Sequence, residues 1–381
     1  MTQSSESILS NGQRATPPAV RPTLQEVATL AGVSRATASR VVNGGAGVRA
    51  SLQVKVRQAV DELGYIPNAA ARTLMTRRHD AVAVVVAEPE SRIFSDPFFA
   101  RQLRGIGREL SASAVQLVLL LVTEAGDYAQ VGRYLAAGHV DGALIFSLHR
   151  DDPLPAIVDG LALPTVYGGR PGWVDPAGPG PQDGDPPYVD PRYVDPRYVD
   201  QLCVDPLYVD ADNRGGARMA VEHLVQRGRR RIAVITGPLD QTSAADRLQG
   251  YRDVLPDTDP RLVAEGDFTA PGGRRAMDEL LARCPDLDAV FAGSDLMAVG
   301  ALAALAERGL RVPEDVAVVG FDDEESVAPW SAPPLTTVRQ DIEDMGRLMA
   351  RLLLRRLDPD AGSTGLTSVV TPAQLVVRSS S

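Results

Sequence analysis

Residues 23–43 read TLQEVATLAGVSRATASRVVN, and this stretch decides the fold of the first part of the chain. Thr23 and Glu26 have the spacing of a capping box, in which the threonine hydroxyl binds an unpaired helix amide and the glutamate binds the threonine amide. Gly32 is suited to end that first helix, and Ser34 can cap a second one. The stretch therefore predicts two short helices joined by a tight turn.

Residues 50–63 add a third helical segment, so residues 21–66 are predicted to form a small three-helix module. The apolar side chains of this segment recur at the helical spacing that buries one face. In a helix-turn-helix, the start of the second helix enters the major groove of DNA. Arg35 stands at that start and can donate two hydrogen bonds to a guanine. An ordinary pair of packed helices is the alternative interpretation.

The distribution of charge favours a polyanion as the partner of this module. Residues 21–78 carry nine Arg and Lys against three acidic residues, whereas residues 81–381 carry 29 basic against 44 acidic residues. A basic module on an acidic body indicates that one end of the chain meets a polyanion and the rest does not. A solvated helical face would give the same count, so the charge supports the helix pattern but does not replace it.

After Asp80, apolar strand-like runs alternate with helical segments. This alternation predicts parallel sheets covered by helices on both faces. Residues 171–206 interrupt this alternation with prolines and with five-residue repeats such as YVDPR at residues 193–197. We expect this segment to form a surface insertion loop rather than a calcium site. Residues 1–20 are rich in Ser, Gly, Pro and Gln and are expected to form a disordered tail.

Several classes of protein are excluded by what the sequence lacks. It has no run of 18 apolar residues and no apolar export signal near its start, so we expect no membrane span. Cys203 and Cys284 give no disulfide framework, which favours a cytoplasmic location. The four histidines are scattered and no Gly-x-Ser-x-Gly or His-Glu-x-x-His motif occurs, so we expect no enzyme, no metal and no cofactor.

Several motifs in order along the chain resemble the LacI/GalR family of bacterial transcription regulators. The signature at residues 23–43 continues as ELGYIPNAAARTL at residues 62–74. Later family-like stretches are DPFF at 96–99, VDADNRGGA at 209–217, SDLMAVG at 294–300, GFDD at 320–323 and PLTTVRQ at 334–340. The resemblance covers nearly the whole chain except the tail and residues 171–206.

This resemblance implies an all-α helix-turn-helix headpiece and an α/β body of two lobes with parallel sheets, like that of periplasmic binding proteins. Residues 21–66 would form the DNA-binding headpiece, and residues 67–80 the hinge helix and linker. The expected N-terminal lobe comprises residues 81–206 with 314–336, and the expected C-terminal lobe residues 207–313 with 337–381.

The headpiece and hinge contain the residues expected to contact DNA. In the family, the leucine that matches Leu74 wedges into the minor groove when two hinge helices pair on the operator, at a stacking cost that the bent DNA recovers. The short alanine-rich segment 69–76 is marginally stable alone, which fits folding on DNA. A small core contact is the alternative role of Leu74. The full expected set is Thr23, Ser34, Arg35, Ala36, Thr37, Ser39, Arg40, Asn43, Tyr65, Asn68, Ala71 and Leu74.

The resemblance also implies an effector cleft between the lobes. An arginine, a carboxylate and aromatic faces suit a polyhydroxylated ring, because fixed polar groups bind its hydroxyls and flat apolar faces cover its CH groups. Each such residue alone could equally belong to the core or to an ion pair. The residues that match the family's cleft are Phe98, Phe99, Ser243, Arg247, Phe268 and Asp295.

The function implied is that of a homodimeric repressor. It would read a pseudo-palindromic double-stranded DNA operator under the control of a small-molecule effector, by family default a sugar. A regulator that responds to a purine or nucleoside is one alternative. A solute-binding protein for a transporter is another, because it shares the body fold, but it would need an export signal and would lack the basic headpiece.

Overall fold

The computed structural model describes residues 22–43, 47–66, 78–174, 206–358 and 366–381. The chain divides into an N-terminal unit, residues 1–79, and a body, residues 80–381. The expected tail, the hinge positions Asn68, Ala71 and Leu74, and most of the repeat-containing insertion lie outside the described residues.

Three helices make up the described N-terminal unit, as the sequence predicts: α1 (Leu24–Ala31), α2 (Arg35–Val42) and α3 (Ala50–Leu63). The capping box is present, because the Glu26 amide donates to the Thr23 hydroxyl (3.3 Å) and the Thr23 amide donates to the Glu26 carboxylate (2.7 Å). Gly32 ends α1 with a φ of 66°, a left-handed conformation that is easy only for glycine. Small buried residues join the three helices: Val27, Ala28, Ala31, Ala38, Val56 and Ala59.

Replacing Thr23 by alanine is expected to lower the free energy of unfolding of this unit by about 1 kcal/mol, because the cap hydrogen bond is lost. Thr29→Ala is the matched control, since Thr29 is also exposed in α1 but its hydroxyl binds only the Gln25 carbonyl within the helix. Hydrogen exchange of the α1 amides measures both variants. Faster exchange in the Thr29 variant than in the Thr23 variant would contradict the role of the cap.

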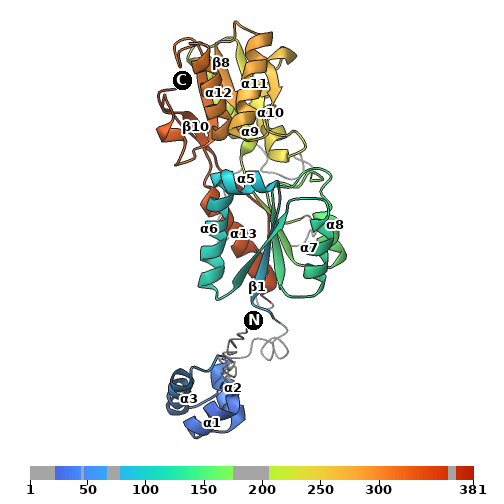
Figure 1. Cartoon of the computed structure of the whole chain (residues 1–381), viewed down its shortest axis with the longest axis vertical. Coiled ribbons are helices and arrows are strands. Elements are labelled where there is room, and N and C mark those ends of the chain that lie inside the picture. The colour runs from blue at the N-terminus through green and yellow to red at the C-terminus, as the bar shows by residue number, and fades with distance from the viewer. Residues whose placement is uncertain (1–21, 44–46, 67–77, 175–205, 359–365) are drawn as a thin grey trace, which may run out of the picture. The chain divides into compact units, whose positions relative to one another are not determined.

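The body contains two six-stranded sheets, one in each lobe (Figure 1). The N-lobe sheet is parallel throughout. In order across it, its strands are β11 (Val369–Thr371), β5 (Tyr208–Ala211), β4 (Thr165–Gly168), β3 (Gly142–Phe146), β1 (Ala81–Ala87) and β2 (Gln116–Val122).

The C-lobe sheet is parallel except at its edge, where β12 runs antiparallel to β10. In order across it, its strands are β12 (Gln374–Val376), β10 (Thr336–Arg339), β9 (Ala317–Asp322), β8 (Ala289–Ala292), β6 (Ile232–Thr236) and β7 (Val263–Glu265).

Helices cover both faces of each sheet, as the apolar strand sequences predict. In β1, neighbouring residues point to opposite faces, so Val84 packs in a cluster with Phe99 and Val85 in another with Leu135. The N-lobe helices are α5 (Glu90–Ser95), α6 (Pro97–Ala112), α7 (Asp127–Ala136), α8 (Leu154–Gly160) and α13 (Ile342–Leu357). The C-lobe helices are α9 (Asn213–Gln226), α10 (Thr242–Val254), α11 (Ala270–Arg283) and α12 (Asp295–Glu307).

The structure corrects the expected division of the lobes. Strands β9 and β10 are hydrogen-bonded beside β8 in the C-lobe sheet, so residues 314–336 belong to the C-terminal lobe. Conversely, α13 packs along α6 (Figure 1), and β11 pairs with β5, so the segments Tyr208–Ala211, Ile342–Leu357 and Val369–Thr371 belong to the N-terminal lobe. The chain crosses between lobes after β5, after β10 and after β11. Hydrophobic runs predict strands such as β1 and β9 but contain no information on which sheet each strand joins.

No helix in the described parts of the chain is long and apolar enough to span a membrane. The same residues contain no group of three or more His, Cys, Asp or Glu side chains placed to hold a metal ion.

Candidate functional site

A cavity opens between the lobes and is lined by residues of both. It encloses about 770 Å³ of space that atoms do not fill, its open side included. Gly168 and Asp322 end β4 and β9 at its wall. Ser147 directly follows β3, and Ser294 comes two residues after β8. Ligands of open α/β sheets bind outside the carboxyl ends of the strands. This cavity is therefore the candidate effector site.

Arg247 of α10 provides a fixed guanidinium at the cavity wall. Its Nε donates to Asn213 Oδ1 (2.9 Å), and Nη1 donates to the Gly293 carbonyl and lies 3.6 Å from Asp322 Oδ1. The guanidinium carbon lies 3.7 Å from the centroid of the Phe321 ring. Only 7% of the residue is exposed, so the side chain is held in one orientation before any ligand binds.

Asp322 is one of three aspartates that line the cavity, the others being Asp96 and Asp210. It accepts a hydrogen bond from Gln340 Nε2 (2.6 Å), and its backbone has a φ of 111°. Burial raises the pKa of Asp322 to about 7, opposed by the nearby Arg247 and reinforced by the Asp96 carboxylate. A group that titrates near neutral pH at a cavity wall is a candidate for ligand recognition.

Two aromatic rings lie at the cavity, one from each lobe. Phe268 of the C lobe has a φ of 62°, and its ring occupies the space that a Cβ on Gly237 would need. The guanidinium carbon of Arg92 lies 4.9 Å from the centroid of that ring. Phe98 of the N lobe lines the cavity and meets Phe99 edge to face, with ring centroids 5.5 Å apart.

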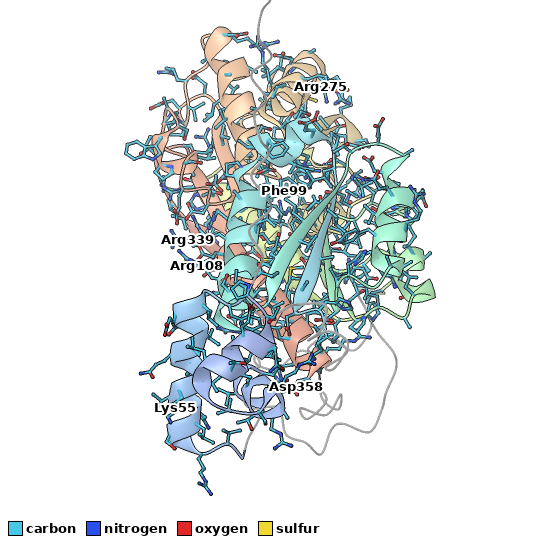
Figure 2. All side chains as sticks on the ribbon, turned by 60° about the horizontal axis from the view of Figure 1, so that its bottom comes forward. Lys55, Phe99, Arg108, Arg275, Arg339 and Asp358 are labelled. Atoms are coloured by element: carbon cyan, nitrogen blue, oxygen red, sulfur yellow. The ribbon has the colours of Figure 1, made fainter. Side chains whose placement is uncertain are left out.

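The structure places four of the six expected effector residues at the cavity, namely Phe98, Ser243, Arg247 and Phe268, and places two behind it. Phe99, labelled in Figure 2, is 1% exposed and stacks on Phe146 in the N-lobe core. The structure thus places Phe99 in the N-lobe core and not on the cavity wall. The apolar spacing of α6 buries this residue, while its neighbour at position 98 faces the cavity.

Asp295 also lies behind the cavity wall and does not line it. Both its carboxylate oxygens are used within the protein, one by the Thr337 hydroxyl (2.5 Å) and the other by the Glu324 amide (2.7 Å). Burial raises the pKa of Asp295 well above its usual range. The carboxylate connects the start of α12 to strand β10 and to the segment that follows β9. The neighbouring Ser294 lines the cavity instead.

Sequence reasoning missed other polar residues of the cavity wall. They include Arg92, Asp96, Gln102, Asn213, Asp322 and Gln340. Three of them stand at or directly after the carboxyl end of a buried strand: Asp322 ends β9, Gln340 follows β10, and Asn213 comes two residues after β5. Polar residues just after buried strands could therefore have been used to predict these cavity residues from the sequence.

The described headpiece residues present a candidate DNA surface along α2. Arg35, Ala36 and Arg40 are exposed, as are Thr23, Ser34 and Asn43, while Thr37, Ser39 and Tyr65 are half-buried. The Ser34 hydroxyl accepts from the Thr37 amide (3.1 Å), so it caps α2. Tyr65 packs against the headpiece core. The exposed part of the expected set is thus spread along α2 from Ser34 to Asn43, with Thr23 at the start of α1.

Effector affinity is expected to fall about tenfold between pH 8 and pH 6, because a single carboxylate with a pKa near 7 becomes protonated in this range and loses its acceptor strength. Affinity is expected to be higher at the higher pH, because the pKa of Asp322 is raised to about 7 and the ionised carboxylate, which accepts hydroxyl hydrogen bonds, predominates above pH 7. Titration calorimetry at pH 8 and at pH 6 measures this change in effector affinity. Asp322→Asn should bind more weakly and lose the pH dependence, and an unchanged profile in this variant would contradict the assignment.

Known protein families match both the N-terminal unit and the body of this chain. Residues 23–68 match the family described as bacterial regulatory proteins, lacI family, and residues 221–381 match the periplasmic binding protein-like domain. The HTH-type transcriptional regulator CelR of Thermobifida fusca is 46% identical over 364 residues, covering 94% of this chain and 98% of the relative. The ribose operon repressor of Escherichia coli K12 is 32% identical over 342 residues, covering 88% and 93%.

Solved structures show the same architecture. A transcriptional regulator CelR–cellobiose complex superposes with a TM-score of 0.70 at 45% identity, covering 95% of this chain and all of the other. The Lac repressor dimer bound to operator and the anti-inducer ONPF superposes with a TM-score of 0.74 at 27% identity, covering 94% and 99%.

Proposed function

Because this chain belongs to the lacI family of bacterial regulatory proteins, we propose that cellobiose, or a closely related β-1,4-linked glucose disaccharide, is the effector that controls its operator binding. The broad function follows from the family. The chain is a DNA-binding transcriptional repressor that acts on an operator as a homodimer and responds to a small molecule. Regulators of this family are in general not enzymes.

The observation that carries the choice of a sugar is the fixed Arg247–Asp322 pair beside two aromatic rings. A guanidinium and a carboxylate in fixed positions can donate to and accept from ring hydroxyls. The Phe98 and Phe268 rings can cover the CH faces of a pyranose.

The choice of a disaccharide of glucose rests on the relative with the highest identity reported above. The CelR relative shares 46% of its residues with this chain, compared with 32% for the ribose operon repressor, and a CelR structure contains cellobiose. Polar lining residues beyond the central pair include Arg92, Asn213 and Gln340, which would serve a ligand with many hydroxyls.

Titration calorimetry of the full chain with cellobiose tests this proposal. Maltose has the same glucose units in an α linkage, ribose is a single smaller ring, and hypoxanthine represents the purine alternative. The expected result is binding of cellobiose and at least tenfold weaker binding of the other three. Preference for ribose or hypoxanthine, or no binding of any sugar, would overturn the assignment.

We assign operator contact to the exposed start of α2. Arg35 offers a bidentate donor for guanine, and Ala36 beside it leaves room for close approach to a base edge. Arg40 and Asn43 are placed to bind phosphates or neighbouring bases. The hinge residue Leu74 remains a proposed minor-groove wedge on the sequence resemblance alone.

A further inference from the structure

A cluster of four polar side chains joins the two lobes beside the effector cavity. Glu88 follows β1 and His149 follows β3 in the N lobe, whereas Asp240 and Gln241 precede α10 in the C lobe. His149 Nδ1 lies 2.8 Å from Asp240 Oδ2, and its Nε2 lies 3.4 Å from Glu88 Oε1. Gln241 Nε2 donates to the same Glu88 oxygen at 2.8 Å. We call these four residues the interlobe cluster.

The charges in the interlobe cluster are complementary across the lobes. The hydrogen bond to Glu88, together with Asp240, raises the pKa of His149 to about 9, although partial burial opposes the shift. His149 is therefore an imidazolium at neutral pH, between one carboxylate of its own lobe and one of the other. Glu88 is almost fully buried, and Arg92 also pairs with it. The negative charge of Glu88 is thus balanced by both His149 and Arg92.

The position of His149 separates it from the effector itself. Of the four residues in the interlobe cluster, Gln241 lines the cavity, whereas Glu88, His149 and Asp240 are not among the lining residues. His149 is about one-third exposed, and Asp240 about half. A change at either residue therefore leaves the effector's own contacts in place and alters the connection between the lobes.

We propose that His149 is a positioning residue for effector binding, which holds the lobes together across the cavity by pairing with Asp240 while it anchors Glu88. The pair favours the arrangement in which both cavity walls reach the effector at once. The proposal deepens the proposed function, since it concerns the same site. It predicts that the pair strengthens effector binding without making any contact to the effector.

A double-mutant cycle on the full chain tests the pairing. His149→Ala and Asp240→Ala are each expected to weaken cellobiose binding about fivefold, in the range of a partly exposed charge-assisted hydrogen bond. The double variant should be no weaker than the worse single variant, because the pair is already broken. The matched control is a cycle on Arg274 and Glu307, an exposed 2.7 Å ion pair within the C lobe, which should leave affinity unchanged.

Hydrogen exchange of the chain without sugar tests directly whether His149 holds the two lobes together. His149→Ala should raise exchange in residues 322–328, which pair with the N lobe through Glu324 and Arg101 at 3.3 Å and do not touch His149. The Arg274→Ala variant should not change these residues. A local structural role would affect only the segments next to position 149.

The outcomes separate this proposal from the proposed function. Wild-type binding of cellobiose with equal affinity in all three cluster variants would overturn the role of His149 and leave the sugar assignment standing. Absence of sugar binding by the wild type would overturn the sugar assignment, and the exchange measurement would still decide the role of His149. Additive losses in the cycle would show that His149 and Asp240 do not act as a pair, which also overturns the proposal.

Discussion

Replacing Arg247 by lysine is expected to weaken effector binding about 100-fold, because a lysine ammonium cannot reproduce the planar set of donors that the guanidinium presents. In the structure, that guanidinium is fixed by Asn213, by the Gly293 carbonyl and by the Phe321 ring, with Asp322 beside it. Lysine retains a positive charge next to Asp322, so the fold should persist. Titration calorimetry with cellobiose measures the loss.

The matched control for this variant is Arg214→Lys. Arg214 also makes a two-point contact with a carboxylate, at 2.6 and 2.8 Å from the Asp253 oxygens, but it lies on the surface of the C lobe and does not line the cavity. Effector affinity and thermal unfolding should both remain near wild type there. Equal affinity of the Arg247 variant and the wild type would show that Arg247 serves packing and not recognition.

Replacing Arg35 by alanine is expected to weaken operator binding by about 1–3 kcal/mol, or roughly 10- to 100-fold, and to relax the preference for one base pair in each half-site. Arg35 is the first residue of α2 and is exposed, as a residue that reads a base edge must be. Fluorescence anisotropy with the operator and with single-base variants of it measures both effects.

Lys55→Ala provides the control for the loss of one headpiece charge. Lys55 lies on α3 and is exposed (Figure 2). Its removal should weaken binding to all DNA sequences by a similar, small factor. A lysine outside the base-reading helix attracts only the phosphate backbone, which is the same in every sequence. A uniform loss in the Arg35 variant, with base preference retained, would make Arg35 a phosphate contact.

Local structure could be predicted closely from the sequence, because local signals determine it. The Thr23–Glu26 capping box and Gly32 mark the bounds of α1, and the apolar run of β1 predicts a strand covered on both faces. Lobe membership was wrong for β5, β9, α13 and β11, because it depends on which elements pair and pack with one another. Strand pairing is a long-range property with no local pattern in the sequence.

The effector site was predicted in part, for a similar reason. Arg247 and Phe268 were expected at the cleft and line it. Asp295 and Asp322 are both carboxylates beside buried strands, and nothing local distinguishes them. Only the folded contacts of Asp295 with Thr337 and Glu324 show that it points inward and that Asp322 faces the cavity.

The measurement that tests the central claim most directly is a footprint of the full chain on the DNA upstream of its own gene, with and without cellobiose. The account predicts a protected pseudo-palindrome that is released by cellobiose and unaffected by ribose at the same concentration. Protection that is indifferent to cellobiose would contradict the effector assignment. Absence of protection of any palindromic site, under conditions in which the chain is folded and dimeric, would contradict operator control at this locus.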